Sequence, residues 1–179
     1  GEVLGDDIRQ AWVGNNHAME GIVHERDGQG HRDFWGIEWV KEGPFNQITR
    51  SPLQEADAAA VAAYRFPHER IPELLGSMTP VLAAGGDHFI GCDVSPCLFE
   101  LMNRLRGMEN AIMDLAAEPE LAAGLLRRCA DFEIALATAA CERLPVDWLW
   151  TGDDVGSQQA MIMSPACWRP KKSARKSGS

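Results

Sequence analysis

Residues 146–156, VDWLWTGDDVG, join a short, largely apolar run to a polar loop with two glycines and two adjacent aspartates. The run is aromatic and follows Pro145, which is typical of a β-strand. It comes after a predicted helix over 119–143, in which apolar residues recur every three or four positions. That stripe consists of Leu121, Leu125, Cys129, Phe132, Leu136 and Ala140. A long helix that leads into a buried strand is the pattern of a parallel α/β sheet.

The preceding part of the chain predicts further strands and helices of the same architecture. The apolar run 81–84, between Pro80 and Gly85, predicts a second strand buried on both faces. Helices are predicted over 96–105 and 108–117, with Gly107 as the break between them. Shorter helices are predicted over 69–75 and from Ser164. Strands that alternate with helices in this way favour parallel βα units.

The N-terminal part predicts extended structure before the first helix. Residues 1–30 are irregular, and apolar patches at 11–13 and 21–23 are compatible with a β-ribbon. Residues 33–40 and 45–49 flank the turn at Gly43 and predict a hairpin. Ser51, with a proline after it and Gln54 three residues on, predicts a capped helix that extends to Tyr64.

Length and charge exclude several classes of protein. The 179 residues, 45% of them hydrophobic, suffice for one folded domain but not for a complete (β/α)8 barrel, which needs about 250. The net charge is −9, and five of the 17 Lys and Arg residues lie in 169–179. The acidic remainder argues against nucleic-acid binding, and 170–179 is expected to be a disordered tail.

No segment has the ~20 apolar residues of a membrane-spanning helix, so no membrane contact is expected. Five irregularly spaced cysteines favour reduced thiols and a cytoplasmic location.

Two loops are predicted to follow strands, at the end of a parallel sheet where ligands bind. One begins at Gly85 and Gly86, and the other carries Asp153 and Asp154. Glycine lets the backbone approach a ligand closely, and carboxylates supply acid–base capacity. The structural alternative for these aspartates is a cap on the next helix.

Asp33 is a third candidate carboxylate, and its structural alternative is a hairpin aspartate held by backbone N–H groups. We expect Asp33, Asp153 and the glycine loop to converge at the carboxyl ends of the strands. His88, Cys92 and Cys97 lack the paired spacing and the fourth ligand of structural zinc sites, so no metal site is predicted.

Short segments spread over residues 33–169 carry a further signal. They are DFWG (33–36), SPL (51–53), FE (99–100), LRGMEN (105–110), MDL (113–115), EPEL (118–121), WTGDDVGSQ (150–158), SP (164–165) and WR (168–169). Taken in this order, they resemble the uroporphyrinogen decarboxylase-like family. The resemblance implies a (β/α)8 barrel fold, of which residues 1–169 would supply roughly the N-terminal half.

The family resemblance also implies a function and roles for residues. The expected activity is that of a carboxy-lyase acting on a tetrapyrrole in porphyrin biosynthesis, without a cofactor. Asp33 and Asp153 are the expected catalytic residues. The expected substrate-binding residues are Gly85, Gly86, Asn103, Arg106 and Asp154.

Two alternatives to the carboxy-lyase remain open. One is a corrinoid-linked methyltransferase acting on a methylated compound, whose zinc ligands would lie outside this chain. The other is a non-catalytic half-barrel that works only by pairing with a second polypeptide. Half a barrel leaves strand edges and apolar helix faces open, so self-association and weak or absent activity of the isolated chain are expected.

Overall fold

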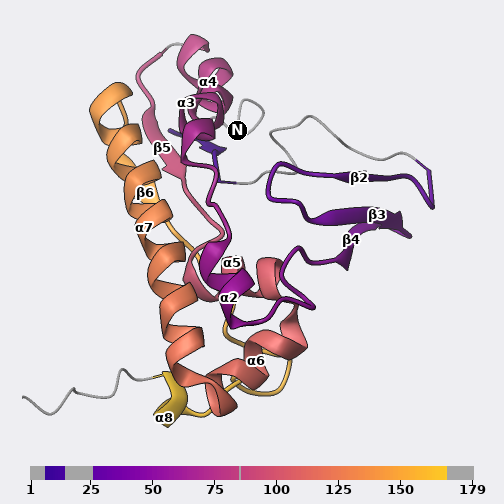
Figure 1. Ribbon diagram of the computed structural model, residues 1–179. Coiled ribbons are helices and arrows are strands. Elements are labelled where there is room, and N and C mark those ends of the chain that lie inside the picture. The colour runs from indigo at the N-terminus through magenta and orange to yellow at the C-terminus, as the bar shows by residue number, and fades with distance from the viewer. Residues whose placement is uncertain (1–6, 15–25, 85, 169–179) are drawn as a thin grey trace, which may run out of the picture.

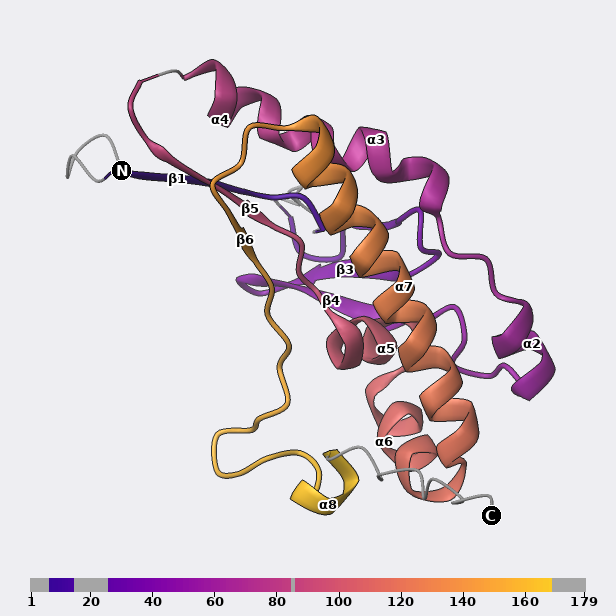
Figure 2. The same ribbon diagram turned by 90° about the vertical axis from the view of Figure 1, so that its left-hand side faces the viewer.

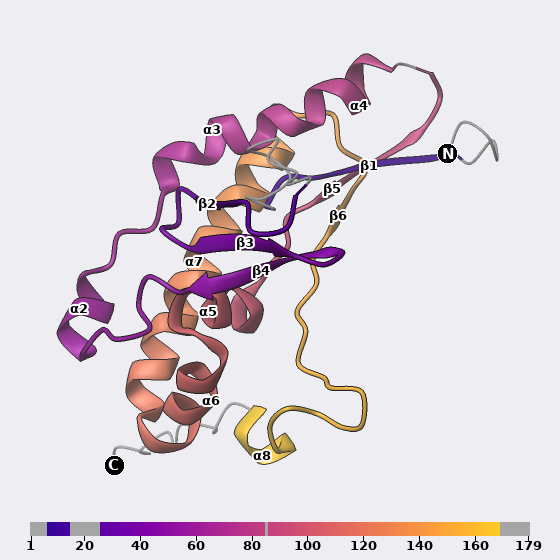
Figure 3. The same cartoon turned by 90° about the vertical axis from the view of Figure 1, so that its right-hand side faces the viewer.

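Two three-stranded sheets, one parallel and one antiparallel, are joined by helices in the computed structural model of this chain (Figure 1). The structure describes residues 7–14, 26–84 and 86–168. The long helix α7 (Pro119–Arg143) runs along one side of the molecule, and the antiparallel sheet lies on the other side (Figures 2 and 3). The predictions for 21–23 and for the tail 170–179 fall outside the described residues.

The parallel sheet consists of β1 (Ile8–Trp12), β5 (Phe89–Asp93) and β6 (Trp148–Trp150), in the order β1-β5-β6. Ile8 pairs with Phe89, and Gly91 pairs with Trp148. The predicted α/β class with parallel strands and flanking helices is confirmed, and among the described residues the sheet remains open. Residues 11–12, part of an apolar patch that the sequence makes compatible with extended structure, lie in β1.

The predicted strand at 81–84 is wrong, because these residues lie in or directly after helix α4 (Thr79–Ala83). Proline is tolerated in the first turn of a helix, and Pro80 occupies that place. A run of four apolar residues carries no period that separates a strand from a buried helical turn. The strand is β5, which begins after Gly86, so Gly86 lies at the amino end of the sheet. The expected convergence of this glycine with Asp153 is therefore also wrong.

The antiparallel sheet consists of β2 (Gly30–Arg32), β3 (Glu38–Glu42) and β4 (Phe45–Arg50). The hairpin of β3 and β4 around Gly43 confirms the prediction. However, β3 begins at Glu38 rather than at residue 33. The Asp33 carboxylate accepts hydrogen bonds from the backbone N–H groups of Trp35 and Ile37, which fold 33–37 into a turn.

Three consecutive helices confirm their predictions: α5 (Leu98–Arg106), α6 (Met108–Ala117) and α7. Gly107, with φ of 82°, ends α5 and precedes α6. The shorter helical elements are α2 (Ala58–Ala63), η1 (His68–Arg70), α3 (Ile71–Leu74), η2 (Leu75–Met78) and α8 (Pro165–Trp168). None of the helices in the described ranges is both long enough and apolar enough to cross a membrane.

The helix predicted to begin at Ser51 begins instead at α2, where Asp57 is the N-cap and accepts a hydrogen bond from the Ala60 backbone N–H. Gln54 does reach back to the Ser51 backbone N–H, at 3.4 Å. However, the backbone N–H of Leu53 bonds to the carbonyl of Leu105 at the end of α5, which holds this stretch as a turn.

An aromatic cluster joins the turn before β3 to α7. The ring of Trp35 packs edge-on against Phe132 of α7, with centroids 4.8 Å apart, and also against Phe66 at 5.9 Å. The predicted stripe of α7 faces this core: Leu125, Cys129, Phe132, Leu136 and Ala140 are buried. Edge-to-face aromatic pairs contribute about 0.5–1.5 kcal/mol beyond their buried area. The cluster therefore fixes the position of α7 relative to the rest of the molecule.

Candidate functional site

Three polar side chains from different elements meet near the carboxyl ends of β5 and β6. Thr151 directly follows β6, Cys97 directly precedes α5, and Glu133 lies in α7. The Thr151 hydroxyl and the Cys97 thiol are hydrogen-bonded, and the thiol donates to Oε2 of Glu133 over 3.7 Å. We call these residues the strand-end cluster. Because Thr151 is exposed while Cys97 and Glu133 are buried, the cluster connects the surface to an internal carboxyl group.

The environment of Glu133 favours its protonated form. Burial is the main cause that raises its pKa to about 8; the hydrogen bond from Cys97 lowers the pKa, and the carboxylates of Asp153 and Asp93 raise it. The carboxyl group is therefore mostly protonated at neutral pH and can supply a proton. Burial also raises the pKa of Cys97, so this cysteine is a neutral thiol rather than a thiolate nucleophile.

Asp153, predicted to be catalytic, lies beside this cluster and holds the N-terminus of α5. One carboxylate oxygen accepts from the Phe99 backbone N–H at 2.9 Å, and the other accepts from that of Glu100 at 2.7 Å. The first backbone N–H groups of a helix have no partner within the helix, and a carboxylate there also interacts favourably with the helix dipole. The capping alternative thus describes the geometry of Asp153.

Asp33, the other predicted catalytic residue, is buried in the turn before β3. Besides its two backbone donors it accepts a hydrogen bond from Nε1 of Trp39 at 2.6 Å. Burial raises its pKa, against the lowering effect of these three hydrogen bonds. Asp33 precedes β3 of the antiparallel sheet, whereas Asp153 follows β6 of the parallel sheet. The hairpin alternative therefore describes the contacts of Asp33.

The predicted substrate-binding residues separate into two groups. Gly85 lies outside the described residues, and Gly86 is at the amino end of β5, away from the strand-end cluster. Arg106 forms an ion pair with Asp114 at 2.7 Å and donates to two backbone carbonyls of the 51–57 turn, so it joins α5, α6 and that turn. Asn103 and Asp154, in contrast, line a common cavity.

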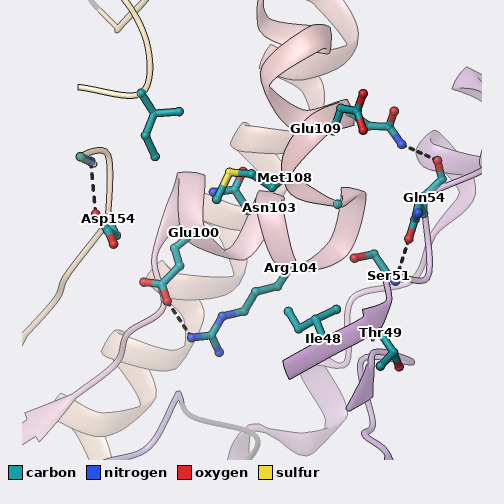
Figure 4. Close-up of a pocket in the computed structure, with 14 residues that line it drawn as sticks. Ile48, Thr49, Ser51, Gln54, Glu100, Asn103, Arg104, Met108, Glu109 and Asp154 are labelled. Carbon is teal, nitrogen blue, oxygen red and sulfur yellow. Dashed lines mark hydrogen bonds and ion pairs between the residues drawn. The ribbon is translucent and has the colours of Figure 1, made fainter. Parts of the chain in front are cut away.

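This cavity has a volume of about 560 Å³ and lies between β4, α5, the start of α6 and the loop 154–162 (Figure 4). We call it the α5 groove. Its lining consists of Ile48, Thr49, Ser51, Gln54, Glu100, Asn103, Arg104, Gly107, Met108, Glu109, Asn110, Asp154, Gly156 and Ile162. Pockets for small organic ligands are typically 300–1,000 Å³, so the groove has a suitable size.

None of the three members of the strand-end cluster is among the catalytic or substrate-binding residues that the sequence predicts. Glu133 lies next to Phe132 and one helical turn after Cys129, both in the predicted apolar stripe of α7. A carboxylate on the buried face of a helix is a signal that a helical projection would reveal. Cys97 carried no comparable signal, because its neighbours in space come from α7 and the end of β6.

No three or more His, Cys, Asp or Glu residues in the described ranges are placed to share a metal ion. All five cysteines are free thiols. Compared with family models, with curated proteins and with solved structures, the chain matches none.

Proposed function

We propose that this chain forms roughly the N-terminal half of a uroporphyrinogen decarboxylase-like barrel and takes part in decarboxylation of a tetrapyrrole carboxylate. The order β1-β5-β6 supports the proposal, since neighbouring parallel strands follow one another along the chain as in a barrel. In enzymes of that architecture the reacting groups come from the carboxyl ends of the strands. The strand-end cluster lies at this end of the sheet.

The observation that carries the proposed chemistry is the hydrogen-bonded series from Thr151 through Cys97 to Glu133. In decarboxylation of a pyrrole side chain, the C–CO2 bond breaks, CO2 leaves, and a proton takes its place on carbon. A protonated carboxyl group is a suitable proton source, and a pKa near the working pH suits a general acid. In this transfer the Cys97 S–H would turn from Glu133 toward Thr151. The Glu133 proton would then pass to the Cys97 sulfur as the thiol proton passes to the Thr151 hydroxyl and the Thr151 proton to the substrate carbon, and Glu133 would recover a proton from water.

A second observation favours the pairing alternative. Ile8, Trp12, Phe89 and Trp150 are all exposed hydrophobic residues of the parallel sheet. Ile8 pairs with Phe89 across β1 and β5, so these two side chains lie on the same face of the sheet. Trp12 and Trp150 both pair with Asp93, one from each neighbouring strand, so they also share a face. An exposed apolar sheet surface is a site of association. We infer that a second copy of the chain covers it, and that the proposed activity belongs to the assembled form.

The test is decarboxylation of uroporphyrinogen by the purified chain, with its monomeric and self-associated fractions assayed separately. We expect slow CO2 release in the associated fraction only. Glu133→Gln should reduce the rate of CO2 release at least tenfold. Glu142→Gln, which alters an exposed residue of the same helix, should leave the rate unchanged. No decarboxylation in either fraction would refute the carboxy-lyase. A monomer with ordinary turnover, ~1–10³ per second, would refute the need for pairing.

A further inference from the structure

Two tryptophans flank an aspartate at the carboxyl end of the parallel sheet. Trp12, Asp93 and Trp150 are the last residues of β1, β5 and β6, and both tryptophans are paired with Asp93. Paired residues project from the same face of a sheet, so the Asp93 side chain begins between the two tryptophan side chains. Ligands of parallel sheets bind at this end of the strands.

Contacts around Ser95 hold both indoles beside Asp93. The Nε1–H group of Trp12 donates to the Ser95 carbonyl. On the other side, the backbone N–H of Gly152 donates to Oγ of Ser95 at 2.7 Å, and a Cβ at Gly152 would stand 3.6 Å from Nε1 of Trp150. The two indoles therefore approach the end of β5 from its two sides. Trp12 is 40% exposed and Trp150 is 52% exposed, so both rings are accessible.

The carboxylate of Asp93 has neutral hydrogen-bond donors only. Its Oδ1 accepts from the Ser95 backbone N–H at 2.9 Å, and its Oδ2 accepts from Nε2 of Gln10 at 3.2 Å. Each carboxylate oxygen has two lone pairs, so each can accept one more hydrogen bond. Within the described residues, no Lys, Arg or His forms an ion pair with Asp93. The negative charge of Asp93 is therefore not compensated by a neighbouring cation.

This face of the parallel sheet carries no cationic side chain. The strand residues that project from it are Ile8, Gln10, Trp12, Phe89, Gly91, Asp93, Trp148 and Trp150. Asp93 alone is charged among them, and the same face of a second copy would add another aspartate and no cation. The charge that complements Asp93 is therefore left to a ligand.

The spacing of the two tryptophans selects a flat cation. Adjacent strands lie about 4.8 Å apart, so the Cα atoms of Trp12 and Trp150 are about 9.6 Å apart. A planar group stacked between two rings needs about 7–8 Å between the rings, because carbon atoms in contact are ~3.5–4 Å apart. A guanidinium is flat, stacks on aromatic rings and donates two parallel N–H groups to a carboxylate. An ammonium group has neither the plane nor the paired donors.

We propose that a small alkylguanidinium compound binds at this end of the sheet, stacked between Trp12 and Trp150, with two N–H groups donated to the two oxygens of Asp93. The ligand is a cation, whereas a tetrapyrrole carboxylate is an anion. The proposal therefore stands independently of the decarboxylase function, and its test requires no enzymatic activity.

The test is titration calorimetry on the monomeric fraction of the full chain with three butyl compounds. Butylguanidine is the flat cation, butylurea its neutral analogue of the same shape, and butylamine a cation that is not flat. We expect saturable binding of butylguanidine at one site, binding of butylamine at least tenfold weaker, and no binding of butylurea. Asp93→Asn should weaken butylguanidine binding about tenfold, and Trp150→Leu about two- to fivefold.

Two control variants make the same changes elsewhere. Asp131→Asn removes a charge at an exposed position of α7, and Phe45→Leu removes an exposed aromatic ring from the hairpin, so neither should change the affinity. Absence of butylguanidine binding, equal binding of butylurea, or equal weakening by Asp93→Asn and Asp131→Asn would each overturn the proposal. Because Trp150 is exposed, Trp150→Leu tests the stacking even where Asp93→Asn fails to fold, and an unchanged affinity in that variant would also overturn the proposal.

Discussion

At the scale of single residues, Glu133 links folding stability to pH. Its pKa is about 8 in the folded chain and 4.5 when unperturbed, so the folded state binds more protons between these values. The free energy of unfolding must then fall as the pH rises from about 4.5 to about 8. The stabilising contribution of protonated Glu133 is complete only below the unperturbed pKa. We expect Glu133→Gln to remove this pH dependence of the free energy of unfolding, which is on the order of a few kcal/mol.

Urea unfolding at pH 5 and pH 8 measures this effect as the difference between wild type and variant. Relative to wild type, Glu133→Gln should be more stable at pH 8 than at pH 5. Glu142→Gln, on the exposed side of α7, should follow the wild type at both pH values. A Glu133→Gln protein with the wild-type pH dependence would show that the carboxyl titrates normally in the folded chain.

At the scale of elements, the start of α5 depends on a carboxylate supplied from the end of β6. Asp153→Ala removes the acceptor for the backbone N–H groups of Phe99 and Glu100, and should cost about 0.5–2 kcal/mol of stability. Asp153→Asn keeps one oxygen and should cost less. Asp154→Ala, at the exposed neighbouring position, should change the free energy of unfolding little. Thermal or denaturant unfolding of the three variants measures these losses of stability. Equal losses of stability for Asp153→Ala and Asp154→Ala would contradict the role of Asp153 as the N-terminal cap of α5.

At the scale of the whole molecule, the exposed face of the parallel sheet should drive self-association. Phe89 is 51% exposed in β5, and a lysine there places a charge on the proposed contact. Phe89→Lys should shift the chain toward monomer on a sizing column. Phe45 in the hairpin is 66% exposed and provides a matched control, so Phe45→Lys should leave the distribution unchanged. Equal shifts in both variants would mean that the parallel sheet is not the contact.

The sequence predicts the parts of this molecule that are determined locally. The stripe of α7 and the break at Gly107 depend on residues a few positions apart, and both appear as expected. The prediction of a strand at 81–84 is wrong, because a short apolar run takes its conformation from distant partners. The same limit applies to the site. Asp153 was recognised as a loop carboxylate, whereas its contact with α5 and the meeting of Cys97 with Glu133 arise only from packing.

The pairing of Ile8 with Phe89 determines the order in which the molecule can fold. Between these two residues the chain forms the whole antiparallel sheet and helices α2 to α4, so the contact closes a very long loop. Loop closure of this kind is entropically costly, and distant contacts form slowly. The β3–β4 hairpin and the packing of α5 to α7 are local and form first. During synthesis β1 is made long before its partner β5, so β1 is the strand that stays unpaired longest in an aggregation-prone state.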